Sequence, residues 1–294
     1  MDTDKKHKVS LVLGSGGARG LAHIGVIEWL NENNFAIRSI SGSSMGALIG
    51  GIYAAGKLDI YKNWVRALER KDVIRLLDLS FGRTGLFKGE RIINALKELI
   101  GERNIEDLPI SFTAVATDID TEKEVWLSKG PLFDAIRASI AIPTIFTPFK
   151  HEGKQLLDGG LVNPIPIAPT LRDLTDMTIA VNLSGKDSVW QNKPTDTEDT
   201  SSHEKKYRNS ISEFIAGLHR MIEAKEPEDM GLFEIMSQSI DTMQNTIASF
   251  KLASYSPDVI INIPKNACRF FEFEKADEMI EIGRRKAQES LSNL

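Results

Sequence analysis

The stretch ISGSSMGALIGG, residues 40 to 51, ends a short apolar run on Gly-Ser-Ser-Met-Gly and continues as a row of small and apolar residues. The run before it predicts a strand at residues 37–40, and the row after it predicts a helix at residues 45–55. A Gly-x-Ser-x-Gly pattern between a strand and a helix is typical of a sharp turn that exposes a serine hydroxyl at the edge of a sheet. Gly42 and Gly46 suit such a turn because they place no Cβ atoms beside it. Ser44 is therefore a candidate nucleophile.

The rest of the chain alternates short apolar or β-branched runs with helical patterns. Strands are expected at residues 8–13, 37–40, 112–117, 125–127, 178–183 and 259–263, and helices at residues 21–30, 45–55, 60–68, 91–100 and 132–141. This alternation predicts βαβ units. The expected fold class is α/β, with a mostly parallel central sheet and helices on both faces.

Composition excludes several classes of protein. The 294 residues are 41% hydrophobic and 26% charged, which is ordinary for a globular chain with one main domain and an appendage. The net charge of −5 provides no positive field for a polyanion, so no nucleic acid is expected. A single cysteine, Cys268, permits neither an intrachain disulfide nor a cysteine zinc site. The N-terminus lacks a signal-peptide pattern and no run of about 18 apolar residues occurs, which predicts a cytoplasmic protein.

A second glycine-rich segment, GSGGARG at residues 14–20, follows a predicted strand and opens a predicted helix. It is not a dinucleotide fingerprint, because Arg19 occupies the position that needs the third glycine, and it lacks the Gly-Lys-Ser/Thr of a P-loop. What remains is a turn that exposes backbone N–H groups at a helix N-terminus, where an anion is favoured. An oxyanion is such an anion.

A serine hydroxyl needs an adjacent base to act as a nucleophile near neutral pH. The chain has five histidines, at positions 7, 23, 151, 203 and 219. None has a convincing setting for a base; His23 is expected to be a packed or surface residue, and His151 is an outside candidate. The segment LLDGGLVNPIP places Asp158 at the end of an apolar run and before two glycines. That is either a common tight turn or a turn that aims the carboxylate inward.

Taken in order, the glycine loop at residues 14–20, the turn at Ser44 and Asp158-Gly159-Gly160 resemble the patatin-like phospholipase family. The likeness runs from about residue 9 to 183 and continues loosely at residues 258–263 and at Gly283. Further matching pieces are Arg137-Ala138-Ser139, Ile142-Pro143, Asn163 and Pro166. Thr144 departs from the pattern, because many relatives have glycine there, and this affects substrate fit.

The resemblance implies a three-layer fold and a bacterial-type serine hydrolase that cleaves carboxylic esters of phospholipids or lysophospholipids. It implies that Ser44 attacks the ester carbonyl while Asp158 accepts its proton, and that water hydrolyses the acyl-enzyme, without metal or cofactor. The backbone N–H groups of Gly16 and Gly17, joined by that of Met45, would hold the oxyanion. Arg19 would brace this loop or contact a lipid phosphate. Gly14, Gly42, Gly46, Gly159 and Gly160 complete the motifs.

The expected domain scheme is a catalytic core at residues 8–183, a polar, disordered insertion at residues 184–210, and a helical appendage at residues 211–294 whose last strand and helix complete the core. The amphipathic stretches at residues 211–221 and 232–247 are packed helices, a lid, a dimer face or a membrane-surface patch. As a lid, Phe214, Leu218 and Met221 would control access of long-chain substrates. The expected partner is a lipid or acyl-ester substrate, with peripheral membrane contact and a homo-oligomer left open.

Two other functions stay open at this stage. One is an ordinary α/β-hydrolase esterase, which requires His151 or His219 as the base. The other is a catalytically idle module that binds lipid or regulates a partner through the amphipathic helices.

Overall fold

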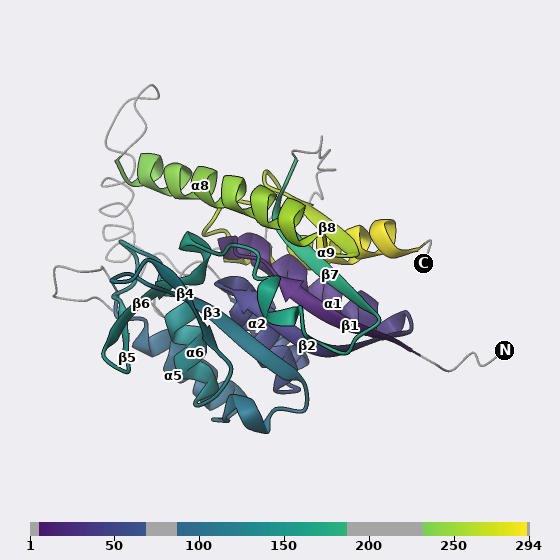
Figure 1. The fold of residues 1–294 in the computed structure, drawn as a ribbon, viewed down its shortest axis with the longest axis horizontal. Coiled ribbons are helices and arrows are strands. Elements are labelled where there is room, and N and C mark those ends of the chain that lie inside the picture. The colour runs from purple at the N-terminus through teal and green to yellow at the C-terminus, as the bar shows by residue number, and fades with distance from the viewer. Residues whose placement is uncertain (1–5, 69–86, 187–231, 293–294) are drawn as a thin grey trace, which may run out of the picture. The chain divides into compact units, whose positions relative to one another are not determined.

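The computed structural model of the protein describes residues 6–68, 87–186 and 232–292 (Figure 1). The chain forms two units, Met1–Ser188 with Gln244–Leu294, and Val189–Met243. We call the first the main unit; the described part of the second is the first half of helix α8 (Leu232–Tyr255). Several predictions lie outside the described residues: most of the polar insertion, the helix at residues 211–221 with Phe214, Leu218 and Met221, and the settings of His203 and His219.

The main unit is built on an eight-stranded sheet with the order β5-β6-β3-β2-β1-β7-β8, in which β4 also pairs with β3. The strands are β1 (His7–Leu13), β2 (Phe35–Ser43), β3 (Ser111–Asp118), β4 (Lys123–Leu127), β5 (Phe149–His151), β6 (Lys154–Asp158), β7 (Met177–Gly185) and β8 (Val259–Pro264). The run from β3 to β8 is parallel, whereas β4, β5 and β6 pair antiparallel. The predicted mostly parallel α/β sheet is confirmed.

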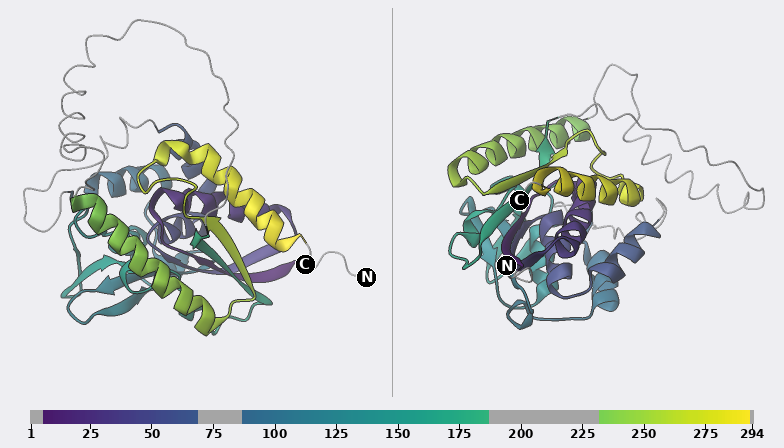
Figure 2. Two further views of the ribbon diagram at one scale, coloured as in Figure 1. Left: turned by 90° about the horizontal axis from the view of Figure 1, so that it is seen from above. Right: turned by 90° about the vertical axis from the view of Figure 1, so that its right-hand side faces the viewer.

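Helices cover both faces of this sheet (Figure 2). The remaining α-helices described are α1 (Ala22–Glu32), α2 (Met45–Ala54), α3 (Leu58–Arg66), α5 (Glu90–Ile100), α6 (Leu132–Ser139) and α9 (Ala276–Leu291). Successive residues of a strand point to opposite faces. Accordingly, Leu13 lies beside Gly50 of α2, while Val12 packs in a cluster with Ala248 of α8. The hydrophobic core therefore lies in two layers, one on each side of the sheet.

The C-terminal part of the chain belongs to the main unit through β8 and α9. Helix α9 packs against α1, and their backbones touch at two glycines. A Cβ atom on Gly283 would lie 1.9 Å from the carbonyl oxygen of Ala22, and one on Gly25 would lie 1.8 Å from that of Ile280. Only glycine fits at either position, so the close packing of α1 on α9 depends on both.

The structure adds β5 and β6 to the ranges given above for the expected strands; of these two, only a short strand after His151 was expected, and β6 fills that place. These two short strands form a hairpin whose turn holds Glu152 and Gly153, both with positive φ. Segments of three and five residues are too short for a clear alternation of apolar and polar side chains. Strand β7 also continues through Gly185, so the first two residues of the predicted insertion are strand.

None of the helices in residues 6–68, 87–186 and 232–292 combines the length and the apolar composition that a bilayer span requires.

Candidate active site

Strand β3 brings Ser44 and Asp158 to the same place. Ser43, the last residue of β2, pairs with Val115, and Asp158, the last residue of β6, pairs with Ala116 on the same edge of β3, because β4 occupies the other edge at both residues. β2 runs parallel and β6 antiparallel to β3, so the two strands run toward each other and end beside consecutive residues of β3, which lie about 3.3 Å apart along the strand. The Ser44 Oγ donates a hydrogen bond of 2.6 Å to Oδ2 of Asp158.

Ser44 has a strained backbone. Its φ of 56° and ψ of −122° lie in a region that residues with a Cβ atom rarely adopt. Such a conformation costs of order 1–3 kcal/mol and persists where the surroundings hold it in place. Here the Ser44 N–H donates to Oγ of Ser139 at 2.9 Å, and the Ser44 carbonyl accepts from the amides of Ala47 and Leu48 in the first turn of α2.

The motif glycines let backbone segments touch around this turn. A Cβ atom on Gly46 would lie 2.0 Å from the carbonyl oxygen of Leu13, at the end of β1. One on Gly159 would lie 2.0 Å from the carbonyl oxygen of Val115, and one on Gly160 would lie 2.5 Å from Oγ of Ser15. The serine turn, the Asp-Gly-Gly turn and the glycine loop therefore pack directly on one another.

Asp158 is 2% exposed and its carboxylate is fixed at both oxygens. Oδ2 accepts from Ser44, and Oδ1 accepts from the Gly160 N–H at 2.7 Å. Burial raises the pKa of the Asp158 carboxyl to about 7, although these two hydrogen bonds favour the charged form and lower it. A carboxyl with a pKa near 7 can exchange a proton near neutral pH, which is the property that a general base needs.

The glycine loop leaves two buried N–H groups available. The amides of Gly14, Ser15 and Ala18 donate to the carbonyls of Val181, Pro164 and Phe270. Within the part of the chain that the structure describes, the amides of Gly16 and Gly17 make no hydrogen bond. Both residues are buried. A buried N–H group that lacks a hydrogen-bond acceptor is stabilised by an anion that can serve as one.

Arg19 and His23 support the loop from behind. Arg19 is 7% exposed, and its Nη1 donates to the Lys265 carbonyl at 3.4 Å. His23 is fully buried, and its Nε2 lies 2.9 Å from the Gly14 carbonyl oxygen. Desolvation lowers the pKa of His23 to about 4, so the ring is neutral and donates from Nε2. The sequence pattern gives no sign of this contact, because nothing in it links a helix residue to the start of the loop.

His151 does not share the hydrogen bond of the candidate nucleophile. It lies in β5, where its ring stacks on Phe149 with centroids 6.3 Å apart. The hydroxyl of Ser44 is directed to Asp158 instead.

The sequence model of the patatin-like phospholipase family matches residues 11–171, which include Ser44, Asp158 and both glycine-rich turns. The chain belongs to the patatin-like phospholipase family. An NTE family protein of Mycobacterium tuberculosis is 38% identical to it over 97% of this chain and 91% of that protein. A patatin-like phospholipase domain-containing protein of Caenorhabditis elegans is 31% identical over 97% of this chain and 21% of its own length. Lysophospholipase NTE1 of Coccidioides immitis is 29% identical over 97% of this chain and 18% of its own length. The prediction of an enzyme of this family is confirmed.

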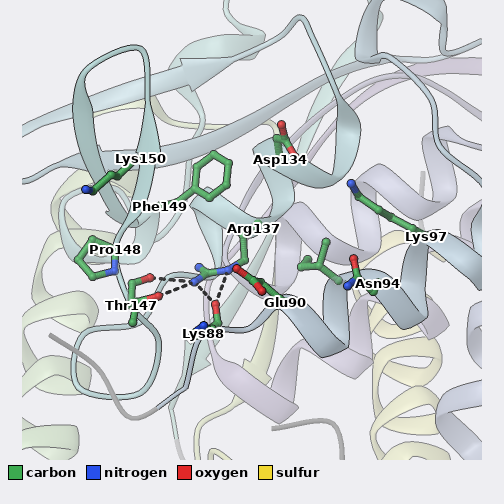
Figure 3. Close-up of a pocket in the computed structure, with 11 residues that line it drawn as sticks. Lys88, Glu90, Asn94, Lys97, Asp134, Arg137, Thr147, Pro148, Phe149 and Lys150 are labelled. Carbon is green, nitrogen blue, oxygen red and sulfur yellow. Dashed lines mark hydrogen bonds between the residues drawn. The ribbon is translucent and has the colours of Figure 1, made fainter. Parts of the chain in front are cut away.

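A hollow of about 490 Å³ lies beside α5 and α6 of this patatin-like core (Figure 3). Its described lining residues include Lys88, Asn94, Asp134 and Lys150, and neither Ser44 nor Asp158 is among them. Buried Arg137 reaches in from α6, donating to the carbonyls of Lys88 and Thr147. The hollow is therefore a neighbour of the candidate active site and not the site itself.

The strain at Ser44 leads to a stability prediction. Ser44→Gly and Ser44→Ala both remove the hydroxyl and its bond to Asp158, but only glycine adopts a φ of 56° without steric cost. We expect Ser44→Gly to be more stable than Ser44→Ala by roughly 1 kcal/mol in urea denaturation. Equal stabilities of the two variants would show that the backbone at this position carries no strain.

Proposed function

We propose that Ser44 and Asp158 form a catalytic dyad that hydrolyses carboxylic esters of lipids. The observation that carries this proposal is the 2.6 Å hydrogen bond from Ser44 Oγ to Asp158 Oδ2, made inside a buried site at a strained turn. An activated serine needs its base within hydrogen-bond reach, and this pair satisfies that requirement. Family membership supports the choice of a lipid ester as substrate.

The reaction would proceed in two halves. Ionised Asp158 accepts the hydroxyl proton as Ser44 Oγ attacks the ester carbonyl, and the tetrahedral intermediate collapses to an acyl-serine while the proton passes to the leaving alcohol. In the second half Asp158 accepts a proton from water, the resulting hydroxide attacks the acyl-serine, and the fatty acid leaves as Ser44 Oγ regains the proton. No group besides water is consumed.

The oxyanion would be held by the N–H groups of Gly16 and Gly17, with that of Met45 as a third donor. The two glycine amides make no hydrogen bond within the described residues, and Met45 begins α2, whose first amides lack intrahelical partners. Donors aimed at developing charge in a buried site contribute about 2.7–4 kcal/mol each to lowering the barrier. The positive end of α2 adds to the same field.

The substrate class that we propose is a phospholipid or lysophospholipid, since one relative is named a lysophospholipase. Peripheral membrane contact, homo-oligomerisation and a cytoplasmic location stay predictions, as do the domain boundaries. Two rivals are less well supported. A catalytic histidine could accept the Ser44 proton only if the hydrogen bond from Ser44 to Asp158 were broken. A lipid-binding module without activity would have no use for that hydrogen bond.

The dyad predicts that Ser44→Ala and Asp158→Asn each lower ester hydrolysis by at least about a thousandfold while the far-ultraviolet circular dichroism stays native. His151→Ala and His219→Ala should each retain most of the activity, because the proton acceptor is a carboxylate. The assay is release of fatty acid from a lysophospholipid together with hydrolysis of a short nitrophenyl ester. A folded Asp158→Asn variant with full activity would rule out the dyad.

The raised pKa of Asp158 predicts how the rate depends on pH. Only the ionised carboxyl can accept the Ser44 proton, so kcat/KM should rise with pH and level off above a midpoint of about 7. The midpoint should hardly move on warming, because ionisation of a carboxyl has little enthalpy, whereas the midpoint of an imidazole would fall. A pH profile at two temperatures separates the two kinds of base.

Stability should show the same ionisation. The Asp158 carboxyl ionises at about pH 7 in the folded protein but near 3.8 in the unfolded chain, so between these values the folded state binds more protons. Stability contributed by this group therefore falls as the pH rises from 3.8 to 7. Asp158→Asn has no carboxyl to ionise at this position, so the free energy of unfolding of the variant should rise relative to that of the wild type as the pH increases across that range. A stability difference that is constant with pH would contradict the raised pKa.

The proposed oxyanion hole can be tested at Gly17. Its φ is +56°, and a Cβ atom there would lie 2.7 Å from the Phe270 carbonyl oxygen, so Gly17→Ala should displace the loop. Gly56→Ala is the matched control, because Gly56 has a φ of +70° but nothing within 4 Å of the added atom. We expect Gly17→Ala to lower kcat by about 100-fold or more with little change in KM, and Gly56→Ala to lower stability alone. If Gly17→Ala raises only KM, the loop binds substrate and the oxyanion is held elsewhere.

A further inference from the structure

The end of helix α6 bonds to the backbone amides of both members of the proposed dyad. The Ser44 N–H donates to Oγ of Ser139 at 2.9 Å, and the Asp158 N–H donates to the carbonyl of Ala141 at 2.9 Å. Ser139 is the last residue of α6, and Ala141 follows two residues later. One short segment therefore holds the two backbone positions whose side chains must meet.

We propose that Ser139 is a positioning residue, whose hydroxyl holds Ser44 in its strained conformation with positive φ and so keeps Ser44 Oγ within reach of Asp158. This inference rests on the proposed dyad for its kinetic consequence, but the backbone role can be tested without activity.

The orientation of the Ser139 hydroxyl supports this role. Its own proton is directed to the Val115 carbonyl oxygen at 2.6 Å, which leaves a lone pair of Oγ for the Ser44 amide. Ser139 is fully buried, so no water can replace the hydroxyl as the acceptor without a rearrangement. Val115 pairs with Ser43 in the sheet. The Ser139 hydroxyl thus links Val115 of β3 to Ser44, the first residue after β2.

Loss of this acceptor would leave the Ser44 N–H buried without a partner. An unpaired buried donor is costly, and the backbone could reduce the cost by returning Ser44 to a negative φ, which also relieves its strain. That rotation would redirect the Cα–Cβ bond of Ser44 and move Oγ away from Asp158. The hydroxyl of Ser139 therefore opposes a relaxation that would separate the dyad.

Helix α6 is itself anchored on its other side. Nε of Arg137 donates to the Lys88 carbonyl at 3.0 Å, and its Nη2 donates to the Thr147 carbonyl at 2.9 Å (Figure 3). The Arg137 guanidinium also lies 5.5 Å from the centre of the Phe146 ring. Since Arg137 and Ser139 share the last turn of α6, these contacts limit how far the Ser139 hydroxyl can shift.

The kinetic test compares Ser139→Ala with Ser41→Ala. Ser41 is also fully buried and donates to a backbone carbonyl, that of Pro166, but its side chain forms no hydrogen bond with either dyad residue. We expect Ser139→Ala to lower kcat by about 100-fold with KM within about threefold of the wild type, as for a small displacement of a reacting group, and Ser41→Ala to stay within about twofold of the wild type. Similar kcat values for the two folded variants would overturn the proposal.

A second pair of variants guards against a failure to fold. Ser139→Thr keeps the hydroxyl and Ser139→Val has the same shape without it, so both add the same volume at a buried position. The proposal requires Ser139→Thr to be at least about tenfold more active than Ser139→Val. Equal activities would assign the effect to packing and overturn the role of the hydroxyl.

The backbone role is tested by a double-mutant cycle on stability with Ser44→Gly. Ser44→Ala and Ser44→Gly both lack the hydroxyl that bonds Asp158, but only the alanine variant keeps the strain of a positive φ, which it can relieve by relaxing once the Ser139 hydroxyl is lost. That relief offsets part of the cost of the lost bond, so the fall in the urea midpoint caused by Ser139→Ala should be larger in Ser44→Gly than in Ser44→Ala. An equal fall in both would overturn the proposal. Because Ser44→Gly has no nucleophile, this result is independent of whether Ser44 and Asp158 form the dyad.

Discussion

The candidate site depends on strand β3, which keeps two distant segments at a fixed spacing. Ser44 and Asp158 are 114 residues apart in the sequence, yet their strands end beside adjacent residues of β3, Val115 and Ala116, on the edge that β4 leaves open. Strand β6 runs antiparallel to β3, so it comes back from the carboxyl edge of the sheet and ends level with the serine turn. The Val115 carbonyl then accepts from Ser139, and the Thr117 hydroxyl donates to the Asp158 carbonyl at 2.8 Å. Each contact ties a part of the site to the same strand.

Much of the site was predictable because its motifs are local. Each motif can be recognised within a few residues: a serine between two glycines, and a carboxylate before two glycines. The strand and helix around Ser44 are predicted by the same stretch. The pairing of β6 with β3 was not predictable in this way, since β5 and β6 are too short to show a period and their register is set by the whole sheet.

Contacts made between elements were also beyond the sequence pattern. His23 binds the Gly14 carbonyl from within α1, and Ser139 binds the Ser44 amide from the end of α6. Ser139 lies in a segment that resembles the family, but the resemblance does not say which group its hydroxyl bonds to. The same limit applies to Arg19, whose guanidinium donates to the carbonyl of Lys265, a residue 246 positions away in the sequence.

In the proposed dyad, backbone groups would orient the base, which a third side chain does in a catalytic triad. In a Ser-His-Asp arrangement the aspartate orients the imidazole, and the imidazole moves the proton. In the proposed dyad one carboxylate does both, so its own orientation must come from elsewhere. The Gly160 amide holds Oδ1 of Asp158, the Ala141 carbonyl holds its amide, and Oδ2 is thereby left for Ser44. Desolvation raises the pKa of Asp158 to about 7, which is close to the pKa of an imidazole. Burial thus gives this carboxyl the basicity that a histidine has in a triad. A buried carboxylate is costly to ionise, and in the proposed dyad that cost would make Asp158 basic enough to accept the serine proton.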